Sequence, residues 1–582
     1  MKKLNKTLAL SLLVIAAGAL SSCGSRAHGD IYYWSCFGGA YTSVLDTLSI
    51  EVGHRVGTEI YHESHNSYDT IKTDVMYQII GEGEYPNIVT GYPDHFAEYI
   101  GSNALVSLDE YLEEYNDDHD TNLLDDYLPA YMEENYSLSA DEDGNPLLYG
   151  LPFNKSTELM GYNGSFVDYA KYLCDNSLDE FTPADDLGTV PATWSEWEVK
   201  GPKYRRILDE LCAPDAQTKG KVIYGRQTYD GHAYDFTVQL RDESHKRTEG
   251  ENIIYYLEDG RVALVDFTNV DKNMSRVISW DSLDNMFITL VRQWGSQYTD
   301  LKDDQKKEEP LYRKGDIMFV APENKQKTID CLRYFTKLHD ARIFGEPSEF
   351  DASYNSEAFE QSKVMFMLCS SGGLSYNTAN WQHRFRVAPL PYRDADHMYV
   401  ISQGADIALT DRSKNYEECF DAMVALTTGD IQAEWCLQTG YYPCSKSAIN
   451  APAYQEFLHE ADDDVVAKRA EGIKEKNPEY TPEQALEKAR EEVYATPTRV
   501  AYREGSVVNE KNYMVEGSKW HKFIDPAFIG SSTIRKLVKS VFKEAFHKTG
   551  DSPDSEFEAI LRGVVDSDDI RSTYKTTIRV VE

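Results

Sequence analysis

The sequence predicts an α/β fold built around a largely parallel sheet. Between residues 30 and 101, β-rich runs alternate three times with segments that have the apolar spacing of helices. The runs are "DIYYWSCF", "TEIYHES" and the first part of "YPNIVTGYPDHFAEYI", and each is followed by a helical pattern. Strands that alternate with helices in this way are typical of βαβ units.

Ligands of parallel α/β sheets bind beyond the carboxyl ends of the strands. Three polar or aromatic residues follow the predicted strands closely, namely Trp34, Ser35 and Asp94. We therefore expect the loops that carry these residues to lie at a binding edge.

The stretch "LLYGLPFNKSTELMGYN", residues 147–163, places five polar residues between two apolar runs that resemble strands. Two interpretations are open. The polar run is either a surface loop or a crossing point at which a cleft needs hydrogen-bonding groups.

The remainder of the chain continues the mixed pattern. From Phe166 the chain is predicted to turn helical. Residues 244–280 are predicted to form a hairpin split at "EDG", and "DNMFITLVRQW" to be a helix that ends at Gly295. Strands are expected in residues 387–410, a helix in 411–437 and charged, solvated helices in 455–495.

The N-terminus has the pattern of an export signal. Three lysines precede a short apolar core, and "LSSC" ends it, which predicts a signal peptide over residues 1–22 and a tether over 23–29. Small residues before Cys23 resemble a lipobox and imply lipidation of Cys23. A plain secretion signal with an incidental cysteine is the alternative. No other segment has eighteen consecutive apolar residues.

The net charge of the chain is −38, from 97 acidic and 59 basic residues. Such a surface repels nucleic acid, and the sequence has no basic stripe. We therefore expect no nucleic-acid partner.

The sequence contains no complete metal-binding motif and neither of two common catalytic motifs. "HESH" (His62–His65) is one residue short of the helical zinc motif, and "SADEDGNP" lacks the ligands of a calcium loop. Neither a nucleophile elbow nor a P-loop is present, so we expect no enzyme, metal or cofactor. Cys436 and Cys444 are close enough in sequence to pair, but small buried thiols explain most of the cysteines equally well.

Several fragments, taken in order, resemble one family. They are "IYYWSCFGGAY", "NSYD", "PNIVTGYPDHFAEYI", "LYGLPFNKSTELMGYN", "PATWSEW", "CSSGGLSY" and "QTGYYP". This set is similar to the extracellular solute-binding proteins of ABC importers, in particular the sugar and glycerol-3-phosphate branch of the maltose-binding-like group. The resemblance runs from about Asp30 to beyond Arg499.

The resemblance implies a two-lobed periplasmic-binding-protein-like fold of type II, in which crossing strands join the lobes and the ligand lies in the cleft between them. It implies lobe 1 from residues 30–151 with 387–430, and lobe 2 from 152–386 with 431–582. "YGLPF" would be the first crossing, and return crossings are expected near Arg386 and Ile431. "NKSTE" would face the cleft.

The resemblance also implies a function. The chain would be a monomeric lipoprotein on the extracytoplasmic face of a membrane, held there by its lipid anchor. It would bind a sugar or a glycerol-3-phosphate-like solute and deliver it to ABC permease subunits. A lipid-anchored glycoside hydrolase and an adhesin-type lipoprotein are the alternatives.

Matching positions of the family's motifs gives a set of candidate ligand-binding residues. They are Trp34, Tyr68, Asp69, Asp94, Ser156, Trp194, Ser370, Ser371, Gly404, Tyr441 and Arg499. Trp34 and Trp194 would stack on a sugar ring, and Arg499 would bind a phosphate. For each tryptophan, burial in a core is the alternative. For Asp69 it is a helix cap, for Ser370 and Ser371 turn formation, and for Arg499 a place on the solvated surface.

Overall fold

The computed structural model describes most of the chain from Asp30 to the C-terminus. The described residues are 30–136, 138–141, 143–178, 180–212, 222–229, 232–239, 246–249, 252–255, 271–301, 314–352, 354–378, 385–412, 414–494 and 496–582. The predicted signal peptide, tether and Cys23 therefore lie outside the described residues, as does the "EDG" turn of the predicted hairpin.

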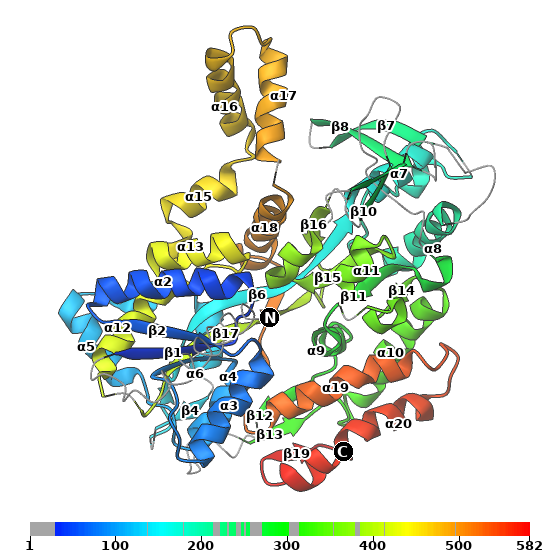
Figure 1. The fold of residues 1–582 in the computed structure, drawn as a ribbon. Coiled ribbons are helices and arrows are strands. Elements are labelled where there is room, and N and C mark those ends of the chain that lie inside the picture. The colour runs from blue at the N-terminus through cyan, green and yellow to red at the C-terminus, as the bar shows by residue number, and fades with distance from the viewer. Residues whose placement is uncertain are drawn as a thin grey trace, which may run out of the picture.

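One mixed sheet runs through the molecule, and it links two lobes (Figure 1). Its strand order is β14-β11-β15-β6-β17-β3-β1-β2, with β16 added beside β6 and β18 beside β17. The strands are β1 (Ile31–Ser35), β2 (Ile60–Ser64), β3 (Ile88–Gly91), β6 (Gly150–Asn163), β11 (Arg276–Trp280), β14 (Phe344–Gly345), β15 (Val364–Ser370), β16 (Phe385–Pro389), β17 (Tyr399–Leu409) and β18 (His521–Phe523).

The first lobe is built on β1, β2 and β3, which are parallel as predicted. The three predicted strand–helix pairs are confirmed. The helices of this lobe are α2 (Ala40–Val56), α3 (Tyr68–Ile80), α4 (Pro93–Gly101), α5 (Asp109–His119), α6 (Pro129–Tyr136), α12 (Tyr416–Thr427), α13 (Gly429–Thr439) and α14 (Lys446–Ile449). α12 and α13 both pack against α2.

The second lobe is built on β11, β14, β15 and β16. Its helices are α7 (Gly164–Asp175), α8 (Trp194–Leu211), α9 (Leu283–Gln293), α10 (Lys325–Asp340), α11 (Asn355–Glu360), α18 (Pro497–Val508), α19 (Ser531–Ala545) and α20 (Asp554–Val565). α9 ends at Gln293 with Trp294 as its C-cap, and Gly295, at which the sequence predicts the end of the helix, follows at φ 74°.

Short strands and hairpins complete the described part of the chain. They are β4 (Ser139–Ala140) with β5 (Pro146–Leu147), β7 (Val222–Tyr229) with β8 (His232–Gln239), β9 (Lys246–Glu249) with β10 (Asn252–Tyr255), and β12 (Thr299–Leu301) with β13 (Gly315–Ile317) and β19 (Ile578–Val580).

The charged segment after α15 (Pro452–His459) is helical, as predicted. α16 (Asp463–Lys476) and α17 (Pro482–Val493) form an antiparallel hairpin that projects from the body in Figure 1. Its small apolar core, which includes Val466, Ala485 and Ala489, is separate from the main core of the molecule.

Strand β6 answers the question raised by residues 147–163, because it is a single 14-residue strand that crosses between the lobes. Its first part, Gly150–Thr157, pairs with β17, and its second part, Glu158–Asn163, pairs with β15 and β16. The surface-loop interpretation is therefore wrong. Every residue of this strand is buried.

The return crossing is β17, which pairs with both β6 and β3 and follows Arg386 on β16. The predicted crossing near Ile431 is wrong. Ile431 lies in α13, whose packing against α2 keeps this segment in the first lobe. The chain re-enters the second lobe at α18, which packs against β16 and the 3-10 helix Ser371–Asn377.

Candidate functional site

A small pocket lies where the two lobes meet, and we call it the inter-lobe pocket. The first lobe and its crossing strand supply Tyr92, Pro93, Asp94, Glu134, Ser402 and Gln403, and the second lobe and the segment that leads into it supply Tyr298, Thr299, Ile524–Ala527, Ser531 and Arg535. The free volume is about 40 Å³. On this measure a cavity needs about 10–15 Å³ to hold one water molecule, so the pocket has room for a few water molecules or one small group.

Five buried polar atoms around this pocket have no hydrogen-bond partner among the described residues. They are Asp94 Oδ1, Tyr298 Oη, Thr299 Oγ1, Ser402 Oγ and Asp525 Oδ2. The side chains of Tyr298 and Thr299 are only 3% and 2% exposed. An unsatisfied buried polar group costs about 1–3 kcal/mol, so a cluster of them indicates a place where a polar guest completes the bonding.

The pocket's only lining cation within the described residues is Arg535, on α19. Its Nη1 donates to Asn285 Oδ1 at 2.9 Å and lies 3.7 Å from Asp284 Oδ2. Burial lowers the pKa of Arg535, but the nearby carboxylates of Asp284 and Asp94 raise it by more. The pKa of Arg535 is therefore above its ordinary value. Arg535 is therefore charged and already balanced by acids.

A buried network of ion pairs lies next to the pocket and shares Glu134 with its lining. Lys155 on β6 pairs with Glu134 of α6 and lies 2.5 Å from Asp406 Oδ1 of β17. Burial lowers the pKa of Lys155, while Asp406 and Glu134 raise it to a net value above the ordinary one. The prediction that "NKSTE" faces the cleft is therefore wrong for Lys155, because its ammonium group is buried and paired with Glu134 and Asp406.

Glu158, the last residue of the polar run, is also satisfied internally. Its Oε1 accepts from Asn285 Nδ2 at 2.7 Å, and its Oε2 accepts from Trp280 Nε1 at 3.2 Å. Burial raises its pKa to about 8. This carboxyl group holds the crossing strand to the second lobe rather than pointing toward a solute.

Three predicted site residues lie together near the junction. Tyr68 begins α3, and its ring centroid is 4.3 Å from that of Tyr92, a lining residue of the pocket. Asn154 Nδ2 donates to Tyr68 Oη at 3.4 Å. Burial raises the pKa of Tyr68, as does the proximity of Cys36, Tyr92 and Tyr441. Tyr68, Asp94 and Tyr441 therefore belong to one region.

Tyr441 lies at the contact between the lobes. A Cβ atom placed on Gly372 would be 2.7 Å from the Tyr441 ring, so only glycine allows this approach. Tyr41 on α2 reaches the same place and donates to the carbonyl of Gly372 at 3.1 Å. These contacts join the first lobe to the 3-10 helix of the second.

Asp69, Ser370 and Ser371 do not contact the inter-lobe pocket in this structure. Asp69 is exposed, and the cap of α3 is Ser67, whose hydroxyl accepts from the Thr70 amide. Ser370 Oγ accepts from the Gly372 amide at 3.2 Å, which is the turn-forming alternative. Ser371 and Ser156 are buried, and neither lines the inter-lobe pocket.

Both tryptophans predicted to stack on a sugar are packed inside the protein. Trp194 is 1% exposed, its Nε1 donates to Gln293, and its ring meets Phe335 edge-on at 4.7 Å. Trp34 packs its ring 4.3 Å from that of His65. Neither ring has a face open to a ligand in this structure, so the core alternative explains both.

Gly404 follows the lining residues Ser402 and Gln403, but neither Gly404 nor Arg499 lines the pocket itself. Gly404 lies in the β17–β6 ladder at φ 123°, where a Cβ atom would be 1.9 Å from the Asn154 carbonyl. This close approach of the two strands requires glycine at position 404. Arg499 donates from Nε and Nη2 to Glu460, which also accepts from Arg503. Its charge is thus already paired.

Sequence patterns missed the second lobe's contribution to the pocket. Tyr298, Thr299, Asp525 and Arg535 come from segments more than 200 residues apart, and no motif precedes them. Only the fold brings them opposite Asp94.

The "HESH" segment has a structural role. His62 Nε2 is 2.7 Å from Ser35 Oγ, and His62 Nδ1 is 2.5 Å from Asp46 Oδ1. This order resembles a hydrolase triad, but Ser35 is 0% exposed and the His62 side chain 1%. No substrate reaches the hydroxyl, so these residues link β1, β2 and α2.

The arrangement of the acidic, histidine and cysteine side chains can be stated for the described residues. Within the described residues, no group of three or more His, Cys, Asp and Glu side chains is arranged to hold a metal ion. The eight cysteines from Cys36 to Cys444 are all free, so the possible Cys436–Cys444 bond is not formed. In the same part of the chain, no helix has the length and apolar content to span a bilayer.

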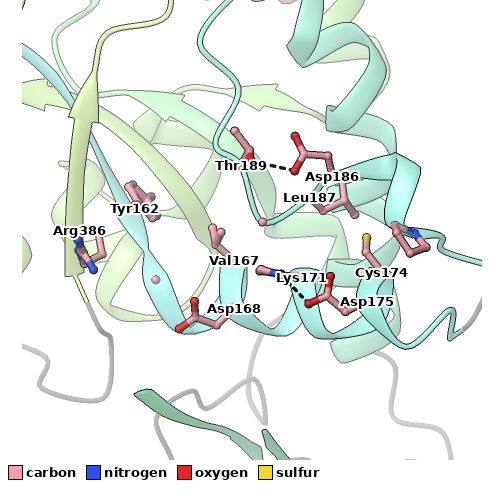
Figure 2. A pocket seen from close by; sticks show the side chains of 13 residues that line it. Tyr162, Val167, Asp168, Lys171, Cys174, Asp175, Asp186, Leu187, Thr189 and Arg386 are labelled. Carbon is pink, nitrogen blue, oxygen red and sulfur yellow. Dashed lines mark hydrogen bonds and ion pairs between the residues drawn. The ribbon is translucent and has the colours of Figure 1, made fainter. Parts of the chain in front are cut away.

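A larger pocket lies within the second lobe alone (Figure 2). Its volume is about 250 Å³, and its lining runs from Tyr162 and α7 to Leu187 and Arg386. Figure 2 shows Lys171 directed at Asp175 and Thr189 at Asp186, and these pairs are 2.5 and 2.8 Å apart. No residue of the first lobe lines it, so it is not formed by the meeting of two lobes.

Comparison with solved structures shows the same fold in several binding proteins. UgpB from Mycobacterium tuberculosis, in complex with glycerophosphocholine, aligns with a TM-score of 0.55 and 16% identity over 93% of this chain and 98% of its own. An ABC substrate-binding protein from Listeria monocytogenes, in complex with cycloalternan, gives 0.54 and 14% over 93% and 98%. The maltotriose-binding protein of Thermus thermophilus gives 0.52 and 12% over 92% and 99%.

These alignments confirm the two-lobed fold. Comparison with curated protein sequences gave no significant match. The family model of bacterial extracellular solute-binding proteins matches residues 55–461, which is more than half of the chain. The chain therefore belongs to the bacterial extracellular solute-binding proteins.

Proposed function

We propose that this protein captures a sugar or oligosaccharide between its two lobes and delivers it to an ABC permease. The observation that supports this most directly is the set of five unpartnered buried polar atoms contributed by both lobes to one pocket. Hydroxyl and carboxylate groups of this kind match the hydroxyls of a carbohydrate. A maltotriose-binding protein and a substrate-binding protein solved in complex with cycloalternan share the fold.

A glycerol-phosphate-like solute is the second candidate, because one structural relative was solved in complex with glycerophosphocholine. The charges favour the sugar. Arg535 already faces Asp284, and Lys155 and Arg499 each pair with acids. A phosphate would have to displace Asp284 from Arg535, whereas a neutral sugar leaves these pairs intact.

The lobes must separate for a sugar to enter, because the present free space admits only one small group. Hinge closure around a ligand is the usual action of such lobes. We assign residues 30–151 with 402–449 to the first lobe, and residues 152–389 with 497–582 to the second. This assignment replaces the division expected at residue 430.

We also propose that Cys23 is lipidated and holds the protein on the outer face of the membrane. The "LSSC" pattern supports this. In cells, a Cys23→Ala variant should move from the membrane fraction to the soluble fraction. Membrane retention of that variant would contradict the proposal.

The test of the solute is a thermal-shift screen of the purified full chain in detergent. Sugars and oligosaccharides are compared with glycerol 3-phosphate and glycerophosphocholine. A ligand at about a hundredfold excess over its Kd stabilises the folded state by about 2.7 kcal/mol. We expect a shift with a sugar and none with the phosphates. The sugar should be recovered unaltered by mass spectrometry, whereas a glycosidase would hydrolyse it.

A further inference from the structure

If the junction of the lobes holds a sugar, as proposed above, then the inter-lobe pocket receives one substituent of that sugar. Its volume of about 40 Å³ accepts a single hydroxyl, hydroxymethyl or amino group but not a ring. The lining atoms therefore decide which substituent is preferred.

Two carboxylate oxygens compete for donors in this pocket. Asp94 Oδ1 comes from the first turn of α4, and Asp525 Oδ2 comes from the segment between β18 and α19. The Asp525 side chain is 7% exposed and that of Asp94 14%. The nearest basic nitrogen to Asp94 Oδ1 that forms an ion-pair contact is His95 Nε2, at 3.9 Å. Burial lowers the pKa of His95 to about 4, which leaves that ring neutral.

A carboxylate oxygen accepts hydrogen bonds and cannot donate them. A hydroxyl group of the solute brings one donor and can satisfy only one of the two oxygens. A protonated amine brings three donors, so it can satisfy Asp94, Asp525 and one of the neighbouring hydroxyls of Thr299 or Ser402. The number of donors therefore favours an amine.

The surrounding charge favours the same group. Among the described residues, three acids line the pocket, and Arg535 is the single cation that does so. Asp525 Oδ1 is paired with Arg292 at 2.5 Å, and Glu134 is paired with Lys155, whereas Arg535 is offset by Asp284. Asp94 therefore shares the positive charge of Arg535 with Asp284, and an ammonium group would supply a second cation to the pocket.

We propose that the inter-lobe pocket is a socket for a protonated amine and that the protein prefers an amino sugar to the matching neutral sugar. The amine would lie between Asp94 of the first lobe and Asp525 of the second. It would thereby help to hold the lobes together around the solute.

The test uses matched sugars and the full chain purified in detergent. Glucosamine, glucose and N-acetylglucosamine, their galactose counterparts, and the β-1,4-linked dimers of each are compared by calorimetry at neutral pH. Hydrogen bonds to charged groups predict that the amine binds at least about tenfold more tightly than its hydroxyl or N-acetyl partner. Equal binding of amine and neutral forms, or tighter binding of a neutral form, would overturn the proposal and leave the proposed function standing.

Two variants test whether Asp94 and Asp525 cause the preference for the amine. Asp94→Asn and Asp525→Asn keep an acceptor oxygen but remove the charge, so each should erase most of the preference for the amine over the matching neutral sugar. The matched control is Asp300→Asn, because Asp300 is exposed beside Thr299 and does not line the pocket. Circular dichroism checks that each variant is folded. A preference unchanged in both folded variants would refute the socket. If no sugar binds at all, the proposed function itself fails.

Discussion

Lys155 shows how a residue chosen by motif position acquires a different role in the fold. The sequence places it in a polar run beside a predicted crossing, which suggests a solute contact. In the structure its ammonium group is fully buried between Glu134 and Asp406, and the carbonyl of Gly404 also accepts from it at 3.3 Å. The buried cation of Lys155 therefore links β6, α6 and β17.

Replacing Lys155 with Met should destabilise the protein by about 3–5 kcal/mol, since the change leaves two carboxylates buried without their cation. Urea unfolding monitored by circular dichroism measures the loss. Adding Glu134→Gln and Asp406→Asn to the same chain should restore much of it. The control is Lys171→Met, which breaks an exposed pair with Asp175 worth about 0.5 kcal/mol or less. A Lys155→Met variant as stable as that control would contradict the role of the network.

Glu158 makes stability depend on pH. Burial raises its pKa to about 8 in the folded protein, from an ordinary value near 4.5. The folded state therefore binds the proton more tightly than the unfolded state, and the free energy of unfolding falls as pH rises between those two values.

Glu158→Gln cannot titrate, so its difference in stability from the parent protein should grow in its favour as pH rises from about 5 to about 8 and then level off. Thermal melts across this range measure the difference. Parallel curves for the two proteins would show that Glu158 does not carry the effect.

At the scale of elements, the crossing strands are fixed by close backbone approach. Gly404 on β17 faces Lys155 on β6, and its positive φ accompanies a shift in register at Ala405 and Asp406. Such irregularities commonly re-aim a strand. By contrast, the α16–α17 hairpin contributes nothing to the crossing, because its core is its own.

Removing residues 464–492 and closing the gap with a short Gly/Ser loop should leave the body folded and the solute affinity within about twofold, as expected for independent sites. Calorimetry with the sugar identified in the screen measures the affinity. Loss of binding by a folded variant would show that the hairpin takes part in solute capture.

At the scale of the whole molecule, a few contacts hold the lobes closed. Lys72 on α3 donates to Ser532 on α19 at 2.7 Å while it pairs with Glu98 of its own lobe. On another element of the first lobe, Tyr41 donates to Gly372 and lies 3.2 Å from Ser375 Oγ. Each bond contributes about 1 kcal/mol, so closure without solute rests on a small balance.

The double variant Tyr41→Phe/Ser532→Ala should open the lobes in the absence of solute, because it removes the cross-lobe bonds and keeps the side-chain packing. Small-angle X-ray scattering should show a larger radius of gyration, and saturating sugar should reduce it. The matched control, Tyr77→Phe/Ser540→Ala, changes the same residue types on α3 and α19 at exposed positions. Identical scattering from both variants would argue against these contacts as the closing force.

Part of the candidate site could be predicted from the sequence. Tyr68, Asp94 and Tyr441 were identified from motifs and lie together at the junction. Trp194 and Trp34 are packed in the core in this structure, and an aromatic residue after a strand or at a helix start fits a core as well as a binding site. Arg499 is paired with Glu460, and nothing in the local sequence reveals that partner.

The sequence by itself determined the strand–helix alternation, the acidic charge and the family, because these depend on local periodicity, composition and ordered motifs. The tertiary structure alone decided that Lys155 and Glu158 bond to buried partners within the protein. It also decided that Tyr298, Asp525 and Arg535 line the same pocket as Asp94. The reason is physical. Whether a polar side chain is satisfied or free depends on partners hundreds of residues away, and only the folded chain brings those partners within bonding distance.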